Sequence, residues 1–168
     1  KYNVASSIFD ALCQSIESYW SKASTDESRK YAAEAIKLIL NNIYESISSP
    51  LSESRRLIVE AAHLSGKAIN LTKTTAPHAL SYKIAEKCSI AHGHSVAITL
   101  GKFFIINENI MKNESNNKYK ALFDIHKEIY SMMGVNNAIE AKDYWYELMK
   151  KCELICDYEE LLLYKNNI

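Results

Sequence analysis

The sequence predicts an all-α fold, on three observations. Apolar residues recur at spacings of three and four along most of the chain, as they do on one face of an α-helix. No stretch of useful length alternates apolar and polar residues, and no hairpin dipeptide such as Asn-Gly is present. Four glycines and two prolines leave few helix interruptions. We expect a helical bundle of about seven or eight helices, forming a single domain over residues 1–168.

The first three predicted helices cover residues 4–21, 25–48 and 52–71. The first has an apolar face made of Ile8, Leu12, Ile16, Tyr19 and Trp20. The second starts at Thr25, a capping residue followed by two acids, and stops before Pro50. Small residues at positions 61, 62, 65 and 66 predict that the third helix crosses a neighbour closely.

The other five predicted helices cover residues 77–88, 92–111, 118–133, 138–151 and 157–165. Pro77 suits the first turn of a helix, with Thr74 or Thr75 as its cap. A polar loop at residues 113–117 separates two of these helices, and Gly134 is placed to end one.

The composition argues against several classes of protein. Hydrophobic residues make up 48% and charged residues 24%, which is ordinary for a globular domain. Twenty basic residues balance twenty acidic ones, so neither a nucleic-acid-binding nor an anionic-membrane surface is indicated. No apolar run approaches the length of a membrane span. The four scattered cysteines lack CxxC spacing, which favours reduced thiols and a cytoplasmic location.

No glycine-rich loop for a nucleotide is present, because no glycine stands in a GxGxxG or phosphate-loop pattern. The chain begins at Lys1 and shows no signal peptide. If this protein uses a nucleotide, we expect the residues that hold its phosphates to lie outside these 168 residues. We therefore expect a domain of a longer protein.

Two histidines are candidate metal ligands, and both follow the Thr-Thr-Ala-Pro stretch. His92 lies fourteen residues after His78, which on one unbroken helix would place them about 21 Å apart. Ligands of one metal must each lie within about 2 Å of it, so a shared site requires a chain break between the two histidines. Residues 88–91, before Gly93, are a reasonable place for that break. Without further residues, ordinary helix-end histidines would be the better explanation.

A carboxylate and an amide on the first helix complete the candidate set. Asp10 and Gln14 are four residues apart and therefore share a helix face, with Asp10 among apolar neighbours. With His78 and His92 they offer two imidazoles, one carboxylate and one amide oxygen. That mixture suits a divalent transition metal such as Fe(II), Zn(II), Co(II) or Mn(II), with a position open for a substrate oxygen.

These residues resemble the iron-containing alcohol dehydrogenases, within the wider dehydroquinate-synthase-like fold. The matching stretches are DALCQSIESYW from Asp10, EAA from Glu60, PHA from Pro77 and HGHSVA from His92. The resemblance covers most of the chain and corresponds to the helical, metal-binding C-terminal domain of that family. It implies metal ligands at the positions of Asp10, Gln14, His78 and His92, and an N-terminal nucleotide-binding α/β domain that this chain lacks.

Two residues depart from the family pattern. Gln14 stands where the family has a histidine, so it is expected either to ligate through its amide oxygen or to hold a water. Tyr82 replaces the second histidine of HxxxH, which lies near nicotinamide in the family. We expect Tyr82 to contact nicotinamide, and Tyr82 and His94 are candidates for proton relay. The alternative for His94 is a helix-surface residue without a role.

The resemblance implies an NAD(P)-linked alcohol dehydrogenase or aldehyde reductase. A divalent metal, Fe(II) or Zn(II), would polarise the aldehyde oxygen, and NAD or NADP would be bound mainly by the missing domain. The sequence is most similar to the branch that contains phosphonoacetaldehyde reductases. In that branch Lys73, Thr74 and Thr75 are candidates for holding an anionic substrate group, although a solvated loop lysine is an equal reading of Lys73. Assembly into a homo-oligomer is compatible with the family.

Two alternatives remain open. A dehydroquinate-synthase-like lyase shares the fold but should show a glutamate ligand and several phosphate-binding basic residues. A non-catalytic helical domain that has lost its metal is the other, because Gln14 departs from the ligand pattern.

Overall fold

The computed structural model describes residues 1–49, 52–113 and 119–166, and this part of the chain is helical with no strand. The helices are α1 (Tyr2–Trp20), α2 (Asp26–Ser48), α3 (Glu53–Thr72), α4 (Ala76–Cys88), α5 (His92–Asn113), α6 (Lys120–Met133), α7 (Ala138–Lys151) and α8 (Tyr158–Asn166). The all-α prediction is confirmed, and the expected helix ends agree to within about two residues. Pro50 and most of the expected polar loop, residues 114–117, lie outside the described residues.

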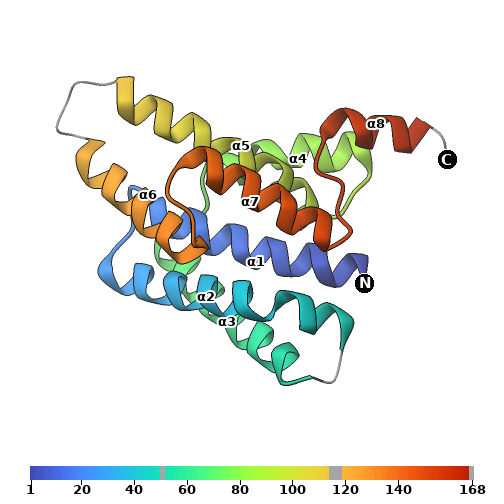
Figure 1. Cartoon of the computed structure of the whole chain (residues 1–168), viewed down its shortest axis with the longest axis horizontal. Coiled ribbons are helices and arrows are strands. Elements are labelled where there is room, and N and C mark those ends of the chain that lie inside the picture. Colours follow the sequence, from blue (N-terminus) through green and yellow to red (C-terminus); the bar gives the residue numbers. More distant parts are fainter. Residues whose placement is uncertain (50–51, 114–118, 167–168) are drawn as a thin grey trace.

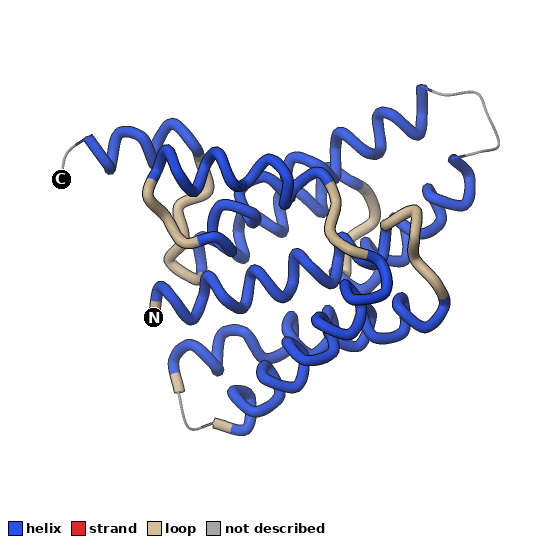
Figure 2. The backbone as a smooth tube through the Cα atoms, turned by 180° about the vertical axis from the view of Figure 1, so that it is seen from behind, coloured by secondary structure: helices blue, strands red, loops and turns tan. Residues whose placement is uncertain are grey.

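Helix α1 runs through the middle of the bundle, with α2 and α3 on one side and α4, α5 and α7 on the other (Figure 1). The view from behind shows the same arrangement (Figure 2). Helix α1 packs directly against α2, α3 and α5. Its apolar residues Phe9, Leu12 and Ile16 are almost completely buried. Four polar residues of α1 are buried as well, namely Ser6, Ser15, Glu17 and Ser18.

The largest buried side chains of the other helices surround α1. They are Ile36, Ile39 and Ile43 from α2, Ile98, Leu100 and Phe104 from α5, Ile129 from α6, and Trp145 and Met149 from α7. The Trp145 ring packs edge-on against Phe9, and its Nε1 donates to the Ala97 carbonyl at 2.8 Å. This hydrogen bond gives the polar atom of the buried Trp145 ring a partner. None of the helices described combines the length and the apolar character that crossing a bilayer needs.

Helix boundaries follow local chemistry where the sequence indicated it. The Thr25 hydroxyl accepts from the Ser28 amide, and the Ser28 side chain accepts from the Thr25 amide, so both form a capping box. Gly134 ends α6 in the left-handed conformation, with φ of 73°. Thr75 stands at the cap position of α4, but its side chain makes no cap hydrogen bond. The Thr75 hydroxyl instead donates to the Glu17 carboxylate.

Candidate metal centre

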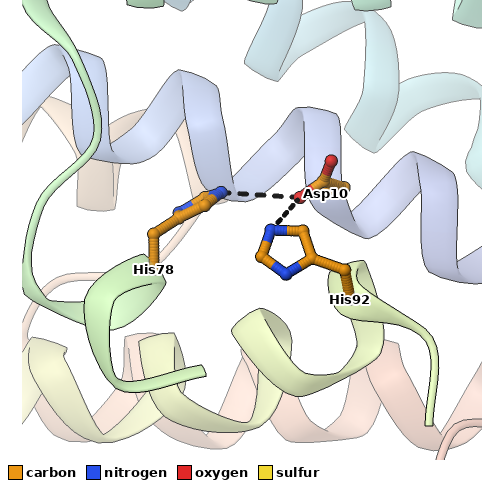
Figure 3. Close-up of side chains that lie close together, drawn as sticks. All are labelled: Asp10, His78 and His92. Atoms are coloured by element: carbon orange, nitrogen blue, oxygen red, sulfur yellow. Dashed lines mark ion pairs between the residues drawn. The ribbon is translucent and has the colours of Figure 1, made fainter. Parts of the chain in front are cut away.

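Three potential metal ligands from three helices meet beside α1. Asp10 comes from α1, His78 from the first turn of α4 and His92 from the first residue of α5 (Figure 3). Asp10 Oδ1 lies 3.5 Å from His78 Nε2 and 3.7 Å from His92 Nε2. One ligand atom of each residue lies within 4.8 Å of the others. The structure thus brings these three predicted ligands together, and their binding of a metal stays a prediction.

The expected break between the two histidines is present. Helix α4 ends at Cys88, and Ser89 takes the left-handed conformation with φ of 55° and ψ of 40°. Helix α5 then begins at His92. Because the chain reverses here, the first turn of α4 and the first turn of α5 can face the same point on α1.

Gly93 allows the start of α5 to approach α1 closely. A Cβ atom at Gly93 would lie 2.1 Å from the Ser6 carbonyl oxygen and 2.8 Å from Asp10 Cβ. No side chain larger than hydrogen fits between α1 and α5 at this point. The neighbouring His92 is therefore held beside Asp10 by the closeness of the two backbones.

Two buried atoms of this cluster have no hydrogen-bond partner among the described residues, namely Asp10 Oδ1 and His78 Nε2. The great majority of buried polar atoms in proteins are paired, so each exception needs an explanation. A carboxylate oxygen and imidazole nitrogens facing one another are the donors that divalent first-row metals prefer. The residues present thus fit a divalent cation, which would satisfy both atoms at once.

Glu17 contacts the ring nitrogen of His78 that does not face Asp10. This carboxylate is completely buried, and its Oε1 pairs with Nδ1 of His78. Its Oε2 accepts from the Thr75 amide at 2.6 Å and from the Thr75 hydroxyl at 2.7 Å. When Nδ1 donates to Glu17, the lone pair of Nε2 is directed toward Asp10 and His92. A ligating histidine usually donates its second ring nitrogen to such a group.

Sequence reasoning did not assign a role to Glu17. The available signal was its spacing: it stands seven residues after Asp10, which places it two turns along on the same helix face. A charged residue in a helix as buried as α1 needs partners, and spacing alone did not show that they are His78 and Thr75.

Burial lowers the pKa of His78, but the carboxylates of Asp10 and Glu17 outweigh that effect and raise it to about 9. At 3.5 Å the Asp10 contact is longer than a hydrogen bond, so we attribute its part to charge attraction. At neutral pH and without a metal, both nitrogens of the His78 ring are therefore protonated, and the positive charge lies between two carboxylates. A cation binding to Nε2 would displace that proton.

Gln14 lies at the edge of the cluster with its amide oxygen pointing away. Its Nε2 donates to Asp10 Oδ2 at 3.1 Å, while its Oε1 is 3.2 Å from the Ser65 hydroxyl. The structure thus brings Gln14 into contact with a ligand residue but does not direct its oxygen at the other ligands. As described, Gln14 is a partner of Asp10.

Tyr82 stacks on His92, with ring centroids 5.3 Å apart and an angle of 24° between the ring planes. It is 64% exposed, so one face of its ring is free to meet a molecule at the site. Asp10 and His92 also line a pocket of about 290 Å³, together with residues near the starts of α1 and α5. The cluster is thus accessible from outside.

His94 is not brought to the cluster. It is 2% exposed, its Nε2 contacts the Ile155 carbonyl at 2.7 Å, and its Nδ1 contacts the Tyr2 hydroxyl at 3.1 Å. Burial lowers its pKa. Both ring nitrogens are occupied, so the geometry does not favour proton relay, and the expected helix-surface position is wrong because the residue is buried.

The candidate substrate residues differ in their availability. Lys73 ends α3 with a positive φ of 68° and is exposed, whereas Thr74 is half-buried. The Thr75 hydroxyl donates to Glu17 and accepts from Trp20 Nε1 at 3.0 Å. Of the three, Thr75 is engaged in supporting His78, and Lys73 is the residue free to meet an anionic group.

The fold and the site define a helical domain with a histidine–aspartate cluster suited to a divalent metal. Residues 4–165 match the Fe-containing alcohol dehydrogenase family, C-terminal, and the chain belongs to this family. The family resemblance inferred from the motifs is therefore confirmed.

Relatives support the same conclusion. A phosphonoacetaldehyde reductase of Streptomyces viridochromogenes is 36% identical over 108 residues, which cover 64% of this chain and 27% of that protein. Aldehyde-alcohol dehydrogenase 2 of Entamoeba histolytica is 26% identical over 170 residues, covering 95% of this chain and 19% of that protein. This chain thus spans only a minor part of the relatives it matches.

Solved structures match the fold. Iron-containing alcohol dehydrogenase from Thermococcus thioreducens superimposes with a TM-score of 0.81 at 24% identity, covering 94% of this chain and 39% of that one. Sulfoacetaldehyde reductase from Bifidobacterium kashiwanohense, in complex with NAD+, gives a TM-score of 0.73 at 27% identity, covering 91% and 38%. The all-α architecture is therefore that of the C-terminal part of such enzymes.

Proposed function

We propose that this chain is the metal-binding catalytic domain of an NAD(P)-linked aldehyde reductase or alcohol dehydrogenase. The observation that carries the proposal is the pair of buried, unpartnered atoms, Asp10 Oδ1 and His78 Nε2, facing each other beside His92. Family membership gives the class of reaction. Asp10, His78 and His92 would hold the metal, with Gln14 as a fourth, neutral contributor.

A divalent metal bound there, Fe(II) or Zn(II), would supply a Lewis acid for the carbonyl oxygen of an aldehyde. The residues of this chain prepare that site. Asp10 contributes the negative charge, and Glu17 fixes the ring orientation of His78. Tyr82, stacked on His92, presents an exposed aromatic face that we assign to the nicotinamide ring and to proton relay.

We propose a small aldehyde with an anionic group as the substrate. The support is the similarity to a phosphonoacetaldehyde reductase and to a sulfoacetaldehyde reductase, two enzymes whose names describe anionic aldehydes. Lys73, exposed at the end of α3 near the first turn of α4, is the cation we assign to the anionic group, with Thr74 beside it. Thr75 belongs to the support of His78 instead.

NAD or NADP would be held mainly by residues outside this chain, because no glycine-rich phosphate loop occurs in the 168 residues. We place that function in an N-terminal nucleotide-binding domain of the same protein. The four free cysteines agree with the cytoplasmic location that we propose. A homo-oligomer remains an expectation from the family resemblance.

The alternatives receive less support from the site. A lyase of the related class should use a glutamate ligand, whereas the carboxylate here is Asp10. A domain that has lost its metal would be expected to give Asp10 Oδ1 and His78 Nε2 hydrogen-bond partners, and neither atom has one among the described residues.

The test is metal analysis of the purified full-length protein, followed by NADH and NADPH oxidation with phosphonoacetaldehyde, sulfoacetaldehyde and an uncharged aldehyde of similar size. We expect bound metal, activity that chelation removes, and preference for the anionic aldehydes. We expect the 168-residue chain alone to be inactive. A full-length protein without metal affinity or aldehyde-dependent NAD(P)H oxidation would contradict the proposal.

A further inference from the structure

The Gln14 side chain bridges Asp10 on one side and Ser65 on the other. Its Nε2 is 3.1 Å from Asp10 Oδ2, and its Oε1 is 3.2 Å from Ser65 Oγ. An amide nitrogen only donates hydrogen bonds, and an amide oxygen only accepts them. Each end of the Gln14 amide therefore has a partner of the right kind in the orientation described.

This orientation gives the Asp10 carboxylate a hydrogen-bond donor when no cation is present. It does not offer a ligand atom to a cation. The amide nitrogen has no lone pair for a metal, and it lies beside Asp10, whose other carboxylate oxygen faces the two histidines. A half-turn of the amide exchanges its oxygen and nitrogen in nearly the same volume. The turned amide would direct Oε1 at the Asp10 side, where a cation attracts it, and would direct Nε2 at Ser65.

Ser65 has the chemistry to partner either end of the amide. A hydroxyl both donates and accepts, and Ser65 Oγ is also 2.9 Å from the Ala11 carbonyl oxygen. When the hydroxyl proton points at Gln14 Oε1, Ala11 still accepts from the Ser15 hydroxyl at 2.8 Å. When the amide turns, Ser65 can accept from Nε2 and donate its own proton to Ala11. Ser65, Ala11 and both ends of the amide would thus have a partner in either state, and the cation would replace the donor that Asp10 Oδ2 loses when the amide turns.

The hydrogen bonds of Ser65 are important because this residue is buried. Ser65 and Ser15 are both 0% exposed, so water does not replace a missing partner at this point. An unpaired polar group in such a place is costly. A residue that could only donate, or only accept, would fix the amide in one orientation.

We propose that the Gln14 amide turns over when a divalent cation occupies the site, so that its oxygen faces the cation. Ser65 is the positioning residue that partners the amide in both orientations. The inference rests on the proposed metal site and adds to it how a glutamine serves where the family pattern has a histidine.

The direct test is NMR of the full-length protein with glutamine labelled by ¹⁵N in its side chain, with and without Zn(II). Gln14 is the only glutamine in these 168 residues, and its signal is assigned by its absence in Gln14→Leu. Without Zn(II), we expect one amide proton at low field, because it bonds to the Asp10 carboxylate. In saturating Zn(II), that low-field shift should be lost.

Mutation of Ser65 shows which atom faces it. Ser65→Ala should shift the Gln14 NH₂ signal strongly in the Zn(II)-bound protein and only weakly in the free protein. Ser15→Ala is the matched control, because Ser15 also donates to the Ala11 carbonyl but makes no contact with Gln14 that the structure describes. It should leave the Gln14 signal nearly unchanged in both states.

Zn(II) affinity gives a second readout. We expect Ser65→Ala to weaken Zn(II) binding about three- to tenfold, because the turned NH₂ group loses its buried acceptor. In the Gln14→Leu background the same substitution should have no effect on affinity, since no amide remains to position. An equal loss in both backgrounds would show a general structural effect of Ser65 and would overturn the proposal.

The NMR outcomes separate this inference from the proposed function. If Zn(II) shifts the ring signals of His78 and His92 while Gln14 keeps its low-field proton, the amide does not turn and the inference fails alone. If Zn(II) shifts none of these signals, the metal site and the inference fail together.

Discussion

The structure buries histidines in two different ways. His94 and His126 have both ring nitrogens engaged: His94 with Tyr2 and Ile155, and His126 with Leu122 at 3.0 Å and Asn107 at 3.2 Å. His78 has one nitrogen on Glu17 and the other without a hydrogen-bond partner. All three are at most 4% exposed. Burial alone therefore does not mark a candidate metal ligand, and what distinguishes His78 is its unpaired nitrogen facing the Asp10 carboxylate.

The charges around these histidines differ in the same way. Burial lowers the pKa of His94 and His126, which favours neutral rings that serve as hydrogen-bonding parts of the core. Burial acts on His78 too, but Asp10 and Glu17 raise its pKa to about 9. The same two carboxylates would also favour a metal cation at His78, in keeping with the proposed site, whereas burial dominates the pKa of the other two histidines.

The largest effect that this comparison predicts is at Asp10. Asp10→Ala should abolish metal binding, because Asp10 provides the only negative charge among the four proposed ligands. Gln14→Ala should weaken binding much less, since it removes a neutral group that water can replace. Metal titration of both variants in the full-length protein checks this. Equal damage from the two substitutions would show that Gln14 positions Asp10 or the substrate rather than acting as a modest ligand.

Glu17 should give the next largest effect. Glu17→Gln keeps the shape but removes the charge that orients the His78 ring, so we expect metal affinity to fall about 10- to 100-fold. The Co(II) absorption spectrum should change as well, because the ligand field at His78 changes. Thr75→Ser is the control that retains both donors to Glu17 and should bind nearly as well as the parent. Unchanged Co(II) affinity in Glu17→Gln would mean that packing alone orients His78.

Sequence reasoning succeeded where the signal is local. Helical spacing, the Thr25 cap and Gly134 predicted the elements, and the separation of His78 from His92 required the break that Ser89 provides. These features depend on residues close together in the sequence. The meeting of Asp10 with the two histidines is not local, and only the resemblance to the family pointed to it.

Sequence reasoning failed where the surroundings of a residue are formed by residues far from it in the sequence. The partners of His94 come from Tyr2 and Ile155, at opposite ends of the chain, so its neighbours in sequence gave no sign of its burial. The expected cap Thr75 instead supports Glu17, which lies 58 residues away. Periodicity shows which face of a helix is buried, but it does not show which polar atoms from other helices meet there.

The smallest predicted effect concerns stability and involves His126, one of the two histidines whose ring nitrogens are both engaged. The pKa of His126 is lowered by burial, so between its folded and unfolded pKa values the unfolded chain binds more protons than the folded one. The stability that the neutral ring provides is therefore present above about pH 6.5 and is lost as the pH falls from there toward the folded value. One such proton steepens the loss by at most about 1.4 kcal/mol per pH unit.

His126→Phe should reduce this loss while keeping the aromatic ring that stacks on Trp20 at a centroid distance of 5.2 Å. The measurement is the free energy of unfolding in urea at pH 7 and pH 5.5, above the range where most carboxylates titrate. His63→Gln is the control, because His63 is exposed on α3. His94 should continue to destabilise the variant at low pH, so the slope should shrink without vanishing. An unchanged slope in His126→Phe would mean that the folded protein accommodates the charged ring, and the contrast with His78 would then depend on hydrogen bonding alone.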